Sequence, residues 1–307
     1  MTHPIRPLSI IYNRKSGFHR QQLNLSEQAI IKIFQDFDFD VLTYEIHADA
    51  SMQQIMHSVI ERHMQYADHG IVVAAGGDGT LNSIAQYLLG SPIALGILPL
   101  GTFNYVARVL NIPLETQQAI KVIALGSNQS VHVARINEHI YLNNASLGLY
   151  PLFIKKREKY NQRFGRLSLN AYSSALEVLI RDRKELKLEI HVDGQKYPVK
   201  SPLIFFGNNQ LQLADLGLKI AKAAEQGKIA GIIVAKSDKC SLFKMLYQLI
   251  KGRIDQAKDV YSFAADHVEI TAKRKAFTVA IDGEIVELRT PIRIHIDKKS
   301  LLVRVPT

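Results

Sequence analysis

The 307-residue sequence has no tryptophan and only one cysteine, Cys240. A single cysteine cannot form an internal disulfide, which argues against a disulfide scaffold from an oxidising compartment. Charged residues make up 21% of the chain and apolar residues 47%, a balance that excludes disordered and collagen-like classes. The residues after Arg6 also lack the long apolar run of a signal peptide. We therefore expect a folded cytoplasmic protein.

One stretch, residues 79–107, has no charged side chain. A membrane-spanning helix needs ~20 mostly apolar residues without interruption, whereas this stretch contains four glycines and two prolines. It fits a buried helix–strand–helix unit better. The whole chain carries 38 Lys and Arg against 28 Asp and Glu, a net charge of +10. This excess favours anionic partners such as a membrane surface, a nucleotide or a nucleic acid.

The first 128 residues alternate between strand-like and helix-like segments, which predicts an α/β domain with a parallel sheet. Buried strands are expected at 8–12, 41–46, 71–75 and 93–98. Helices are expected after the caps Ser26 and Asp49 or Ser51, and over 81–89, 105–110 and 115–125.

Residues 129–307 consist mainly of short strand-like segments. Turn signals at Asp193-Gly194 and Asp282-Gly283 separate some of them, which predicts a mostly antiparallel β domain. Helical stretches at 167–181 and 241–251 interrupt the strands. Chains above ~250–300 residues tend to form more than one core. We therefore predict two domains, 1–128 and 129–307.

The strongest motif is the run GGDGTLN at residues 76–82, which follows the strand 71–75 and begins a helix. Glycines let backbone N–H groups approach an anion, and a helix N-terminus adds positive potential. Asp78 does not suit phosphate by charge, but it suits Mg²⁺ that bridges phosphates. The alternative is a tight turn in which Asp78 caps the helix.

Two further loops follow strands in the same way. Residues 99–104, with Gly101, Thr102 and Asn104, follow the strand 93–98, and residues 13–17 follow the first strand. The carboxyl ends of parallel strands form the ligand-binding edge of an open α/β sheet. Three such loops therefore predict a nucleotide site there. Neither the P-loop pattern nor the G-x-G-x-x-G pattern fits it.

The chain resembles the diacylglycerol kinase catalytic-domain family, which includes bacterial lipid kinases and relatives of sphingosine and ceramide kinases. The resemblance rests on motifs that span nearly the whole chain, namely Asn13 with Ser16-Gly17, GGDGTLN at 76–82, LGILPLGTFN at 95–104, NNASLG at 143–148 and Asp282-Gly283-Glu284. It implies a β-sandwich-like second domain, a cleft between the domains, and transfer of the ATP γ-phosphate to a lipid hydroxyl with Mg²⁺.

The resemblance also implies roles for individual residues. Asp282 would accept the proton of the lipid hydroxyl, and Glu284 would support Asp282 or bind metal. Asp78 would be a third catalytic residue, placed at the bound nucleotide. The residues expected to bind the nucleotide are Asn13, Ser16, Gly76, Gly77, Asp78, Gly79, Thr80, Leu81, Asn82, Gly101, Thr102 and Asn104. Without the family, Asp282-Gly283 predicts only a hairpin turn.

The sequence departs from the family pattern at three points. Arg14 stands where a proline is usual, and Tyr105 stands where an aspartate is usual. Gln226 stands in the shortened segment 220–227, where many members have an acidic ligand of a structural Mg²⁺. We assign no metal-ligating residues on this basis. A kinase of a soluble substrate such as NAD, and a nucleotide-binding protein without turnover, remain alternatives.

Two basic segments with apolar residues could contact an anionic membrane, Lys155–Arg166 and Lys239–Arg253. The alternative for each is an ordinary solvated face above a core stripe. No nucleic-acid-binding motif accompanies them, so we expect no nucleic-acid partner. The expected partner is a lipid substrate at the inner face of the membrane, and a homodimer is left open.

Overall fold

The structure is a computed structural model that describes residues 6–13, 25–46, 51–164, 185–235, 238–251 and 253–307. The chain divides into two compact units. The first comprises residues 1–133 and 298–307, and the second comprises residues 134–297. The sequence reasoning assigned residues 298–307 to the second domain, whereas the structure has the last strand ending in the first unit. Among the described residues, no helix is long and apolar enough to cross a bilayer.

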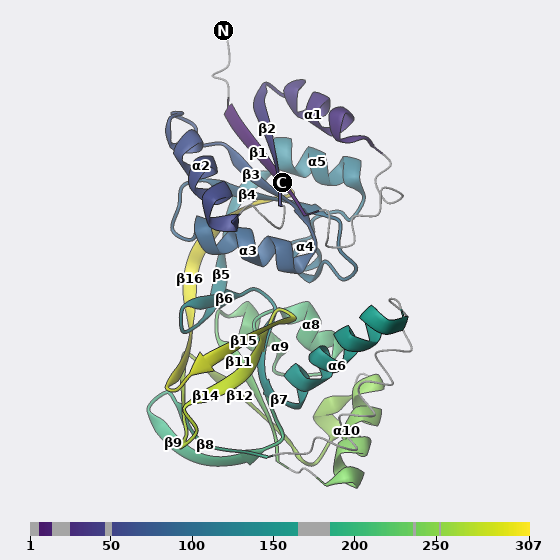
Figure 1. The fold of residues 1–307 in the computed structure, drawn as a ribbon, viewed down its shortest axis with the longest axis vertical. Coiled ribbons are helices and arrows are strands. Elements are labelled where there is room, and N and C mark those ends of the chain that lie inside the picture. The colour runs from purple at the N-terminus through teal and green to yellow at the C-terminus, as the bar shows by residue number, and fades with distance from the viewer. Residues whose placement is uncertain (1–5, 14–24, 47–50, 165–184, 236–237, 252) are drawn as a thin grey trace. The chain divides into compact units, whose positions relative to one another are not determined.

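The first unit contains a parallel sheet with helices on its faces (Figure 1). Its elements are β1 (Arg6–Tyr12), α1 (Glu27–Gln35), β2 (Phe39–Glu45), α2 (Met52–Met64), β3 (Ile71–Gly76), α3 (Asp78–Leu88), β4 (Ala94–Pro99), α4 (Tyr105–Val109) and α5 (Thr116–Leu125). The strand order is β2-β1-β3-β4, and every neighbouring pair is parallel. The end of β16 (Ile292–Val305) pairs in parallel with β4. This confirms the predicted α/β class.

Local sequence explains the helix boundaries of this unit. The Ser26 hydroxyl accepts the N–H of Ala29 at 3.1 Å and caps α1, as predicted. The Glu115 carboxylate caps α5 in the same way through the N–H groups of Gln117 and Gln118. One boundary differs from the prediction. Helix α3 begins at Asp78 rather than at residue 81, so the GGDGT motif already supplies its first turn.

The second unit is built from two antiparallel sheets. One has the order β12-β11-β10-β7-β14-β15. The other, β16-β13-β8-β9, is the antiparallel part of the sheet that continues through β16 into β4 of the first unit. The bounds of the strands are β5 (Ser127–Ile136), β6 (His139–Tyr141), β7 (Asn144–Gly148), β8 (Leu186–Val192), β9 (Gln195–Ser201), β10 (Leu203–Gly207), β11 (Ile229–Val234), β12 (Val260–Ala265), β13 (His267–Thr271), β14 (Ala276–Ile281) and β15 (Glu284–Arg289). The strand-like run 139–149 is not continuous, because the chain leaves the strand between β6 and β7.

Side chains of both sheets form one core. Leu147, Phe206 and Val279 of the first sheet pack in the same buried cluster as Ile190 and Ile292 of the second. A shared core between two sheets is the defining feature of a β-sandwich. The C-terminal unit is thus the antiparallel sandwich that the sequence and the resemblance predicted.

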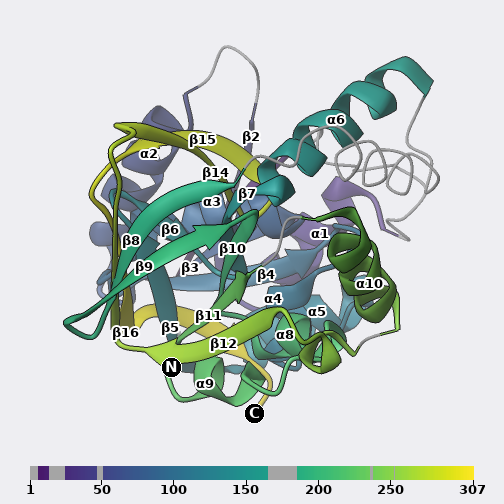
Figure 2. The ribbon, with the colours of Figure 1, turned by 90° about the horizontal axis from the view of Figure 1, so that it is seen from below.

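Helices cover the other face of the sheet that contains β10. They are α6 (Leu149–Phe164), α8 (Gln210–Asp215), α9 (Ala221–Glu225) and α10 (Lys239–Ile250), with the short 3-10 turn η1 (Ile254–Gln256) after them. Figure 2 shows α6, α8 and α10 on the side of this sheet away from β8 and β9. Successive side chains of β10 point to opposite faces of the sheet: Phe206 faces the sandwich core, and Phe205 packs with the helices. The predicted helix 167–181 lies outside the described residues.

Candidate functional site

Asn13, directly after β1, and the two glycine loops after β3 and β4 lie together at the carboxyl edge of the first unit's sheet, while residues 14–17 lie outside the described residues. Asn13 follows β1, and its backbone N–H donates to the carbonyl of Ala75 in β3 at 3.4 Å. The N–H of Leu100, after β4, donates to the carbonyl of Gly76 at 3.0 Å. The parallel register therefore brings the loops together, as the sequence predicted. Ser16 lies outside the described residues.

Two glycines let the second and third loops touch through their backbones. A Cβ added to Gly101 would lie 2.5 Å from the Cα of Gly77, and one added to Gly77 would lie 3.2 Å from the Cα of Gly101. A Cβ on Gly76 would lie 2.6 Å from the Thr80 hydroxyl oxygen. Gly76 and Gly101 need glycine because of close approach and not because of an unusual backbone angle, while a Cβ on Gly77 would make only a tight contact.

Asp78 joins the same two loops through its side chain. Its carboxylate accepts the backbone N–H of Tyr105 at 3.3 Å and that of Val106 at 3.2 Å. These residues begin α4, where N–H groups lack partners within the helix. Asp78 therefore caps a neighbouring helix, and not its own as the alternative interpretation held. This gives Asp78 a structural function, while its role toward a metal stays a prediction.

Polar side chains fix the remaining parts of these loops. Asn104 adopts a left-handed backbone conformation with φ +49°, and its amide exchanges hydrogen bonds with the backbone of Gly101 at 3.0 and 2.8 Å. The Asn13 amide donates to the Thr80 hydroxyl at 3.2 Å. Because Asn104, Thr80 and Leu81 are buried, they hold the loops from within. The predicted residues with solvent-accessible surface are Asn13, Gly77, Asp78, Gly79, Asn82, Gly101 and Thr102.

The N-terminus of α3 is suited to an anion. Its N-cap is Gly77, which has no side chain to satisfy the N–H groups of the first turn. The helix has 11 residues, so its dipole adds positive potential at this end. Backbone N–H groups at such a position bind phosphates without help from a side chain.

The position of Tyr105 carries an aromatic cluster in place of the family's usual carboxylate. The Tyr105 ring stacks on Phe103 with a centroid distance of 5.7 Å and an interplanar angle of 8°. The Arg108 guanidinium lies 5.5 Å from the Tyr105 ring. An acidic ligand is therefore absent from this position of the loop.

In the second unit, Asp282 occupies the turn between β14 and β15. Asp282 has φ +45° and Gly283 has φ +91°, and Ile281 pairs with Glu284 across the turn. Positive φ at both central residues defines the tight two-residue hairpin that Asp-Gly favours. The structure confirms the predicted turn.

The Asp282 carboxylate is held by the backbone of Leu142 and of the first two residues of the NNASLG segment. It accepts the N–H of Leu142 at 2.7 Å, of Asn143 at 2.9 Å and of Asn144 at 2.8 Å. The Asp282 N–H donates in return to the carbonyl of Asn144 at 2.9 Å. Three N–H donors stabilise a negative charge and fix its position. Two motifs that lie far apart in the sequence therefore form one structural feature.

A set of amide side chains surrounds this segment. The Asn209 amide donates to the Asn143 side chain at 2.9 Å, and the Asn144 amide donates to Gln212 at 2.8 Å. The Asn208 amide donates to the carbonyl of Leu142 at 3.3 Å. The sequence reasoning did not single out Asn208, Asn209 or Gln212. Their signal was an amide-rich run immediately after the apolar strand β10.

Burial shifts two titratable groups near Asp282. Burial, and then the charge of Asp282, raise the pKa of the fully buried Tyr141 hydroxyl, which therefore stays neutral. Glu284 is exposed to solvent on one side, yet desolvation by the surrounding protein still raises the pKa of its carboxyl. Glu284 thus holds a proton more readily than an ordinary glutamate.

The segment that carries Gln226 forms part of the core and not a ligand loop. Ala221, Ala223 and Ala224 of α9 are buried against β11, and Gln226 follows the helix as its C-cap. Across the described parts of both units, no group of three or more His, Cys, Asp or Glu side chains is arranged to hold a metal ion.

Comparisons with known proteins agree with these features. The family model of the diacylglycerol kinase catalytic domain matches residues 7–136, and that of the YegS C-terminal NAD kinase beta sandwich-like domain matches residues 155–305. A diacylglycerol kinase of Staphylococcus aureus strain bovine RF122 / ET3-1 is 26% identical over 279 residues, covering 90% of this chain and 85% of the relative. One from strain MRSA252 is 27% identical over 282 residues, with the same coverage.

Solved structures show the same fold. The crystal structure of a putative diacylglycerol kinase from Bacillus anthracis str. Sterne superposes with a TM-score of 0.72 at 20% identity, covering 99% of this chain and 98% of that one. A diacylglycerol kinase structure from the same organism gives a TM-score of 0.66 at 18% identity with the same coverage. With both domain models matched in order, the chain belongs to the diacylglycerol kinase catalytic-domain family.

Proposed function

We propose that this protein is an ATP-dependent lipid kinase that transfers the γ-phosphate of ATP to the hydroxyl of diacylglycerol or a similar lipid alcohol. Membership of a lipid-kinase family supports this class of reaction. The observation that carries the proposal is the glycine loop at the start of α3, which is held against the Gly101 loop and offers backbone N–H groups to phosphate.

The nucleotide half of the reaction falls to the first unit. The N–H groups of Gly77–Gly79 and the dipole of α3 would bind the phosphates, and Thr102 would contact them from the neighbouring loop. Phosphoryl transfer depends on positioning and on neutralised charge, and it needs no covalent help from the protein. The rigid backbone contact between Gly77 and Gly101 serves positioning directly.

Magnesium fits the donors of this loop. Mg²⁺ binds oxygen ligands, usually one or two carboxylates together with substrate phosphates and waters. Asp78, which is partly exposed to solvent, supplies a carboxylate of this kind. When bound with ATP, the ion would neutralise phosphate charge. Since Tyr105 replaces the carboxylate usual for the family, Asp78 would carry this contact alone on these two loops.

The acceptor half falls to Asp282. We assign it the task of orienting the lipid hydroxyl and taking its proton as the phosphate is transferred. The three N–H bonds from residues 142–144 fix the position of the carboxylate, which suits an orienting role. Glu284, with its raised pKa, would support Asp282 from the same hairpin. A lipid substrate would bring the protein to the inner face of the membrane as a peripheral enzyme.

The test is transfer of labelled phosphate from ATP·Mg²⁺ in anionic mixed micelles. The acceptor panel is diacylglycerol, monoacylglycerol, ceramide, sphingosine and phosphatidylglycerol, with NAD as the soluble control. We expect labelled phosphate on at least one lipid of the panel and none on NAD. Labelled NAD alone would assign a soluble substrate, and tight ATP binding without any labelled product would assign a nucleotide-binding protein without turnover.

A further inference from the structure

Helix α10 has an outward face of unusual composition. Residues 239–253 contain four Lys or Arg and no Asp or Glu. Phe243 and Tyr247 are 37% and 60% exposed on this helix, and Lys244 and Lys251 are exposed beside them. The Lys251 ammonium lies 5.9 Å from the Tyr247 ring. Exposed aromatic rings interleaved with cations therefore form one surface, which we call the α10 face.

The helical period places these side chains together. Successive residues turn by about 100° around a helix, so positions 243, 244, 247 and 251 fall within about 100° of one another. The opposite side of the helix belongs to the protein core, because Leu242 and Met245 are buried in it. The sequence left two interpretations of this segment open, a membrane contact or a solvated face above a core stripe. Leu242 fills the core stripe, while Phe243 faces outward.

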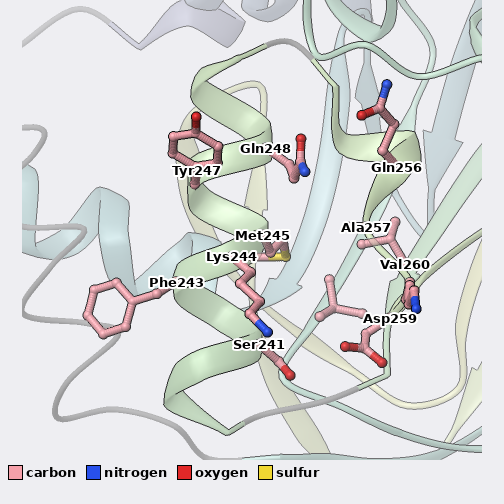
Figure 3. A pocket seen from close by; sticks show the side chains of 12 residues that line it. Ser241, Phe243, Lys244, Met245, Tyr247, Gln248, Gln256, Ala257, Asp259 and Val260 are labelled. Atoms are coloured by element: carbon pink, nitrogen blue, oxygen red, sulfur yellow. The ribbon is translucent and has the colours of Figure 1, made fainter.

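A cavity of about 630 Å³ lies beside the α10 face, between the helix and residues 256–260. Its floor is apolar, with Val234, Met245 and Val260. Its polar lining contains two lysines, Lys244 and Lys258, and one carboxylate, Asp259, together with Ser241, Gln248 and Gln256. Figure 3 shows Gln248 and Met245 directed toward this cavity, while Phe243 points away from the Ala257–Val260 segment. The volume lies in the range of small-molecule sites. An apolar floor beside a polar lining in which two lysines outnumber one carboxylate suits an amphiphile with an anionic headgroup.

We propose that the α10 face docks on an anionic phospholipid bilayer and that the neighbouring cavity receives one lipid headgroup. Phe243 and Tyr247 would enter the headgroup boundary, where amphipathic aromatic side chains are stable. Lys244, Lys251 and Lys258 would meet lipid phosphates. This docking rests on the proposed lipid-kinase function, because it would bring the enzyme to the membrane that holds its substrate.

Charge complementarity selects this occupant. The chain carries a net charge of +10, and residues 238–259 contain five Lys or Arg against three Asp, a local excess of cations that favours an anionic surface. Each lysine near an anionic leaflet adds about 1 kcal/mol of attraction, or about fivefold in affinity. Aromatic rings would add an apolar contribution that salt does not screen.

Co-sedimentation with vesicles tests the proposal without relying on catalysis. Wild-type protein should bind vesicles that contain phosphatidylglycerol and phosphatidylcholine, and bind pure phosphatidylcholine weakly. Lys244→Gln with Lys251→Gln should lower binding by about 30-fold and flatten its salt dependence. Phe243→Ser with Tyr247→Ser should lower binding by about tenfold at every salt concentration.

Matched controls lie on β9 of the same unit. Tyr197 is 46% exposed and Lys200 is also exposed there, so Tyr197→Ser and Lys200→Gln remove the same kinds of side chain from another surface. These controls should bind vesicles like wild type. Equal losses in controls and α10 variants would overturn a specific docking face. Because all the substituted side chains are exposed, thermal unfolding should change little in any variant.

A second readout separates docking from catalysis. The α10 variants should phosphorylate a short-chain diacylglycerol dissolved as monomers at the wild-type rate, and lose activity only on vesicles. A wild-type protein that binds vesicles through α10 but phosphorylates no lipid would support docking and overturn the proposed function. Variants that bind vesicles like wild type, or a face that binds a single-stranded oligonucleotide and not vesicles, would overturn docking.

Discussion

Two Asp-Gly turns of the second unit share one local design. Asp193-Gly194 joins β8 to β9, and Asp282-Gly283 joins β14 to β15, with positive φ at all four residues. In each turn, one carboxylate oxygen accepts two consecutive backbone N–H groups. Those of Asp266 and His267 bind Asp193 at 3.1 and 2.9 Å, as those of Asn143 and Asn144 bind Asp282.

The reciprocal bond is also shared. The Asp193 N–H donates to the carbonyl of His267 at 3.0 Å, just as that of Asp282 donates to Asn144. In both cases the turn aspartate caps the first residue of a neighbouring antiparallel strand, β13 or β7. Hydrogen bonds of this kind are therefore a folding device, and they do not by themselves identify a catalytic aspartate.

The two turns differ in the residues that surround the aspartate. Asp282 accepts a third N–H, from Leu142, and the amide side chains of Asn208, Asn209 and Gln212 bond to the same segment. Glu284, whose carboxyl has a raised pKa, follows the second turn, whereas the neutral Gln195 follows the first. The catalytic role proposed for Asp282 rests on these polar neighbours and on the family. The Asp193-Gly194 turn, which has the same geometry without them, is a matched control.

The largest expected effect is on turnover. Asp282→Asn should lower kcat by about 10²- to 10⁴-fold, because a positioned proton acceptor contributes that much. Its affinity for ATP, measured by equilibrium dialysis, should change less than about threefold, since the glycine loops belong to the other unit. Loss of ATP affinity in parallel with kcat would show that the substitution acts through the fold.

The next largest effect is expected on ATP affinity, through the glycine loops of the first unit, which contain neither Asp-Gly turn. Gly101→Ala should weaken ATP binding about 10- to 100-fold, because its Cβ would meet the Gly77 backbone at 2.5 Å and displace the loop. Gly90→Ala is the control, since it introduces strain at φ +68° with no atom within 4 Å of the new Cβ. Equal ATP affinity in the two variants would contradict the role of the Gly77–Gly101 contact.

Substitution of Glu284, the residue after the Asp282-Gly283 turn, should have a smaller effect on kcat. Glu284→Gln makes the second turn read Asp-Gly-Gln like the first, and it should lower kcat about tenfold. Because burial raises the pKa of Glu284, the folded protein binds this proton more tightly than the unfolded chain does. The stability contribution of this carboxyl therefore falls as pH rises from its ordinary value of 4.5 through the raised value.

Urea unfolding across this pH range checks the pH dependence. Wild type should lose stability over that interval relative to Glu284→Gln, and the gap should stay constant at higher pH. A variant whose stability follows the wild-type curve at every pH would show that Glu284 is not desolvated in the folded protein.

The smallest effect is the difference in stability between the two aspartate variants. Each substitution leaves backbone donors poorly satisfied, at roughly 1–3 kcal/mol for buried groups. Asp193→Asn should lose about 1 kcal/mol, because water can replace its carboxylate, and Asp282→Asn about 1 kcal/mol more. Urea denaturation at pH 7 measures both. A far larger loss in Asp282→Asn would make its kinetic defect a consequence of unfolding.

Local sequence signals predicted much of the architecture. Strand runs such as 71–75, the Ser26 cap and both Asp-Gly turns depend on neighbouring residues only, and all are confirmed. The meeting of Asn13 with the two glycine loops also followed from the sequence, because parallel strands share a carboxyl edge.

What could not be predicted depends on contacts between distant residues. No local pattern indicates that Asp78 caps α4, that Asp282 bonds to Leu142–Asn144, or that Asn208 and Asn209 join that cluster. Periodicity also could not decide which face of α10 meets the core, since apolar residues occupy both the buried position 242 and the exposed position 243.

The most direct test of the account is lipid phosphorylation by wild type, Asp193→Asn and Asp282→Asn side by side, in the same anionic micelles at saturating ATP. Circular dichroism and urea unfolding would verify that all three are folded. The account predicts labelled lipid from wild type and Asp193→Asn at rates within about twofold of each other, and at least 100-fold less from Asp282→Asn. Equal rates in the two folded variants would contradict it, because Asp282 would then be only a second copy of the structural turn.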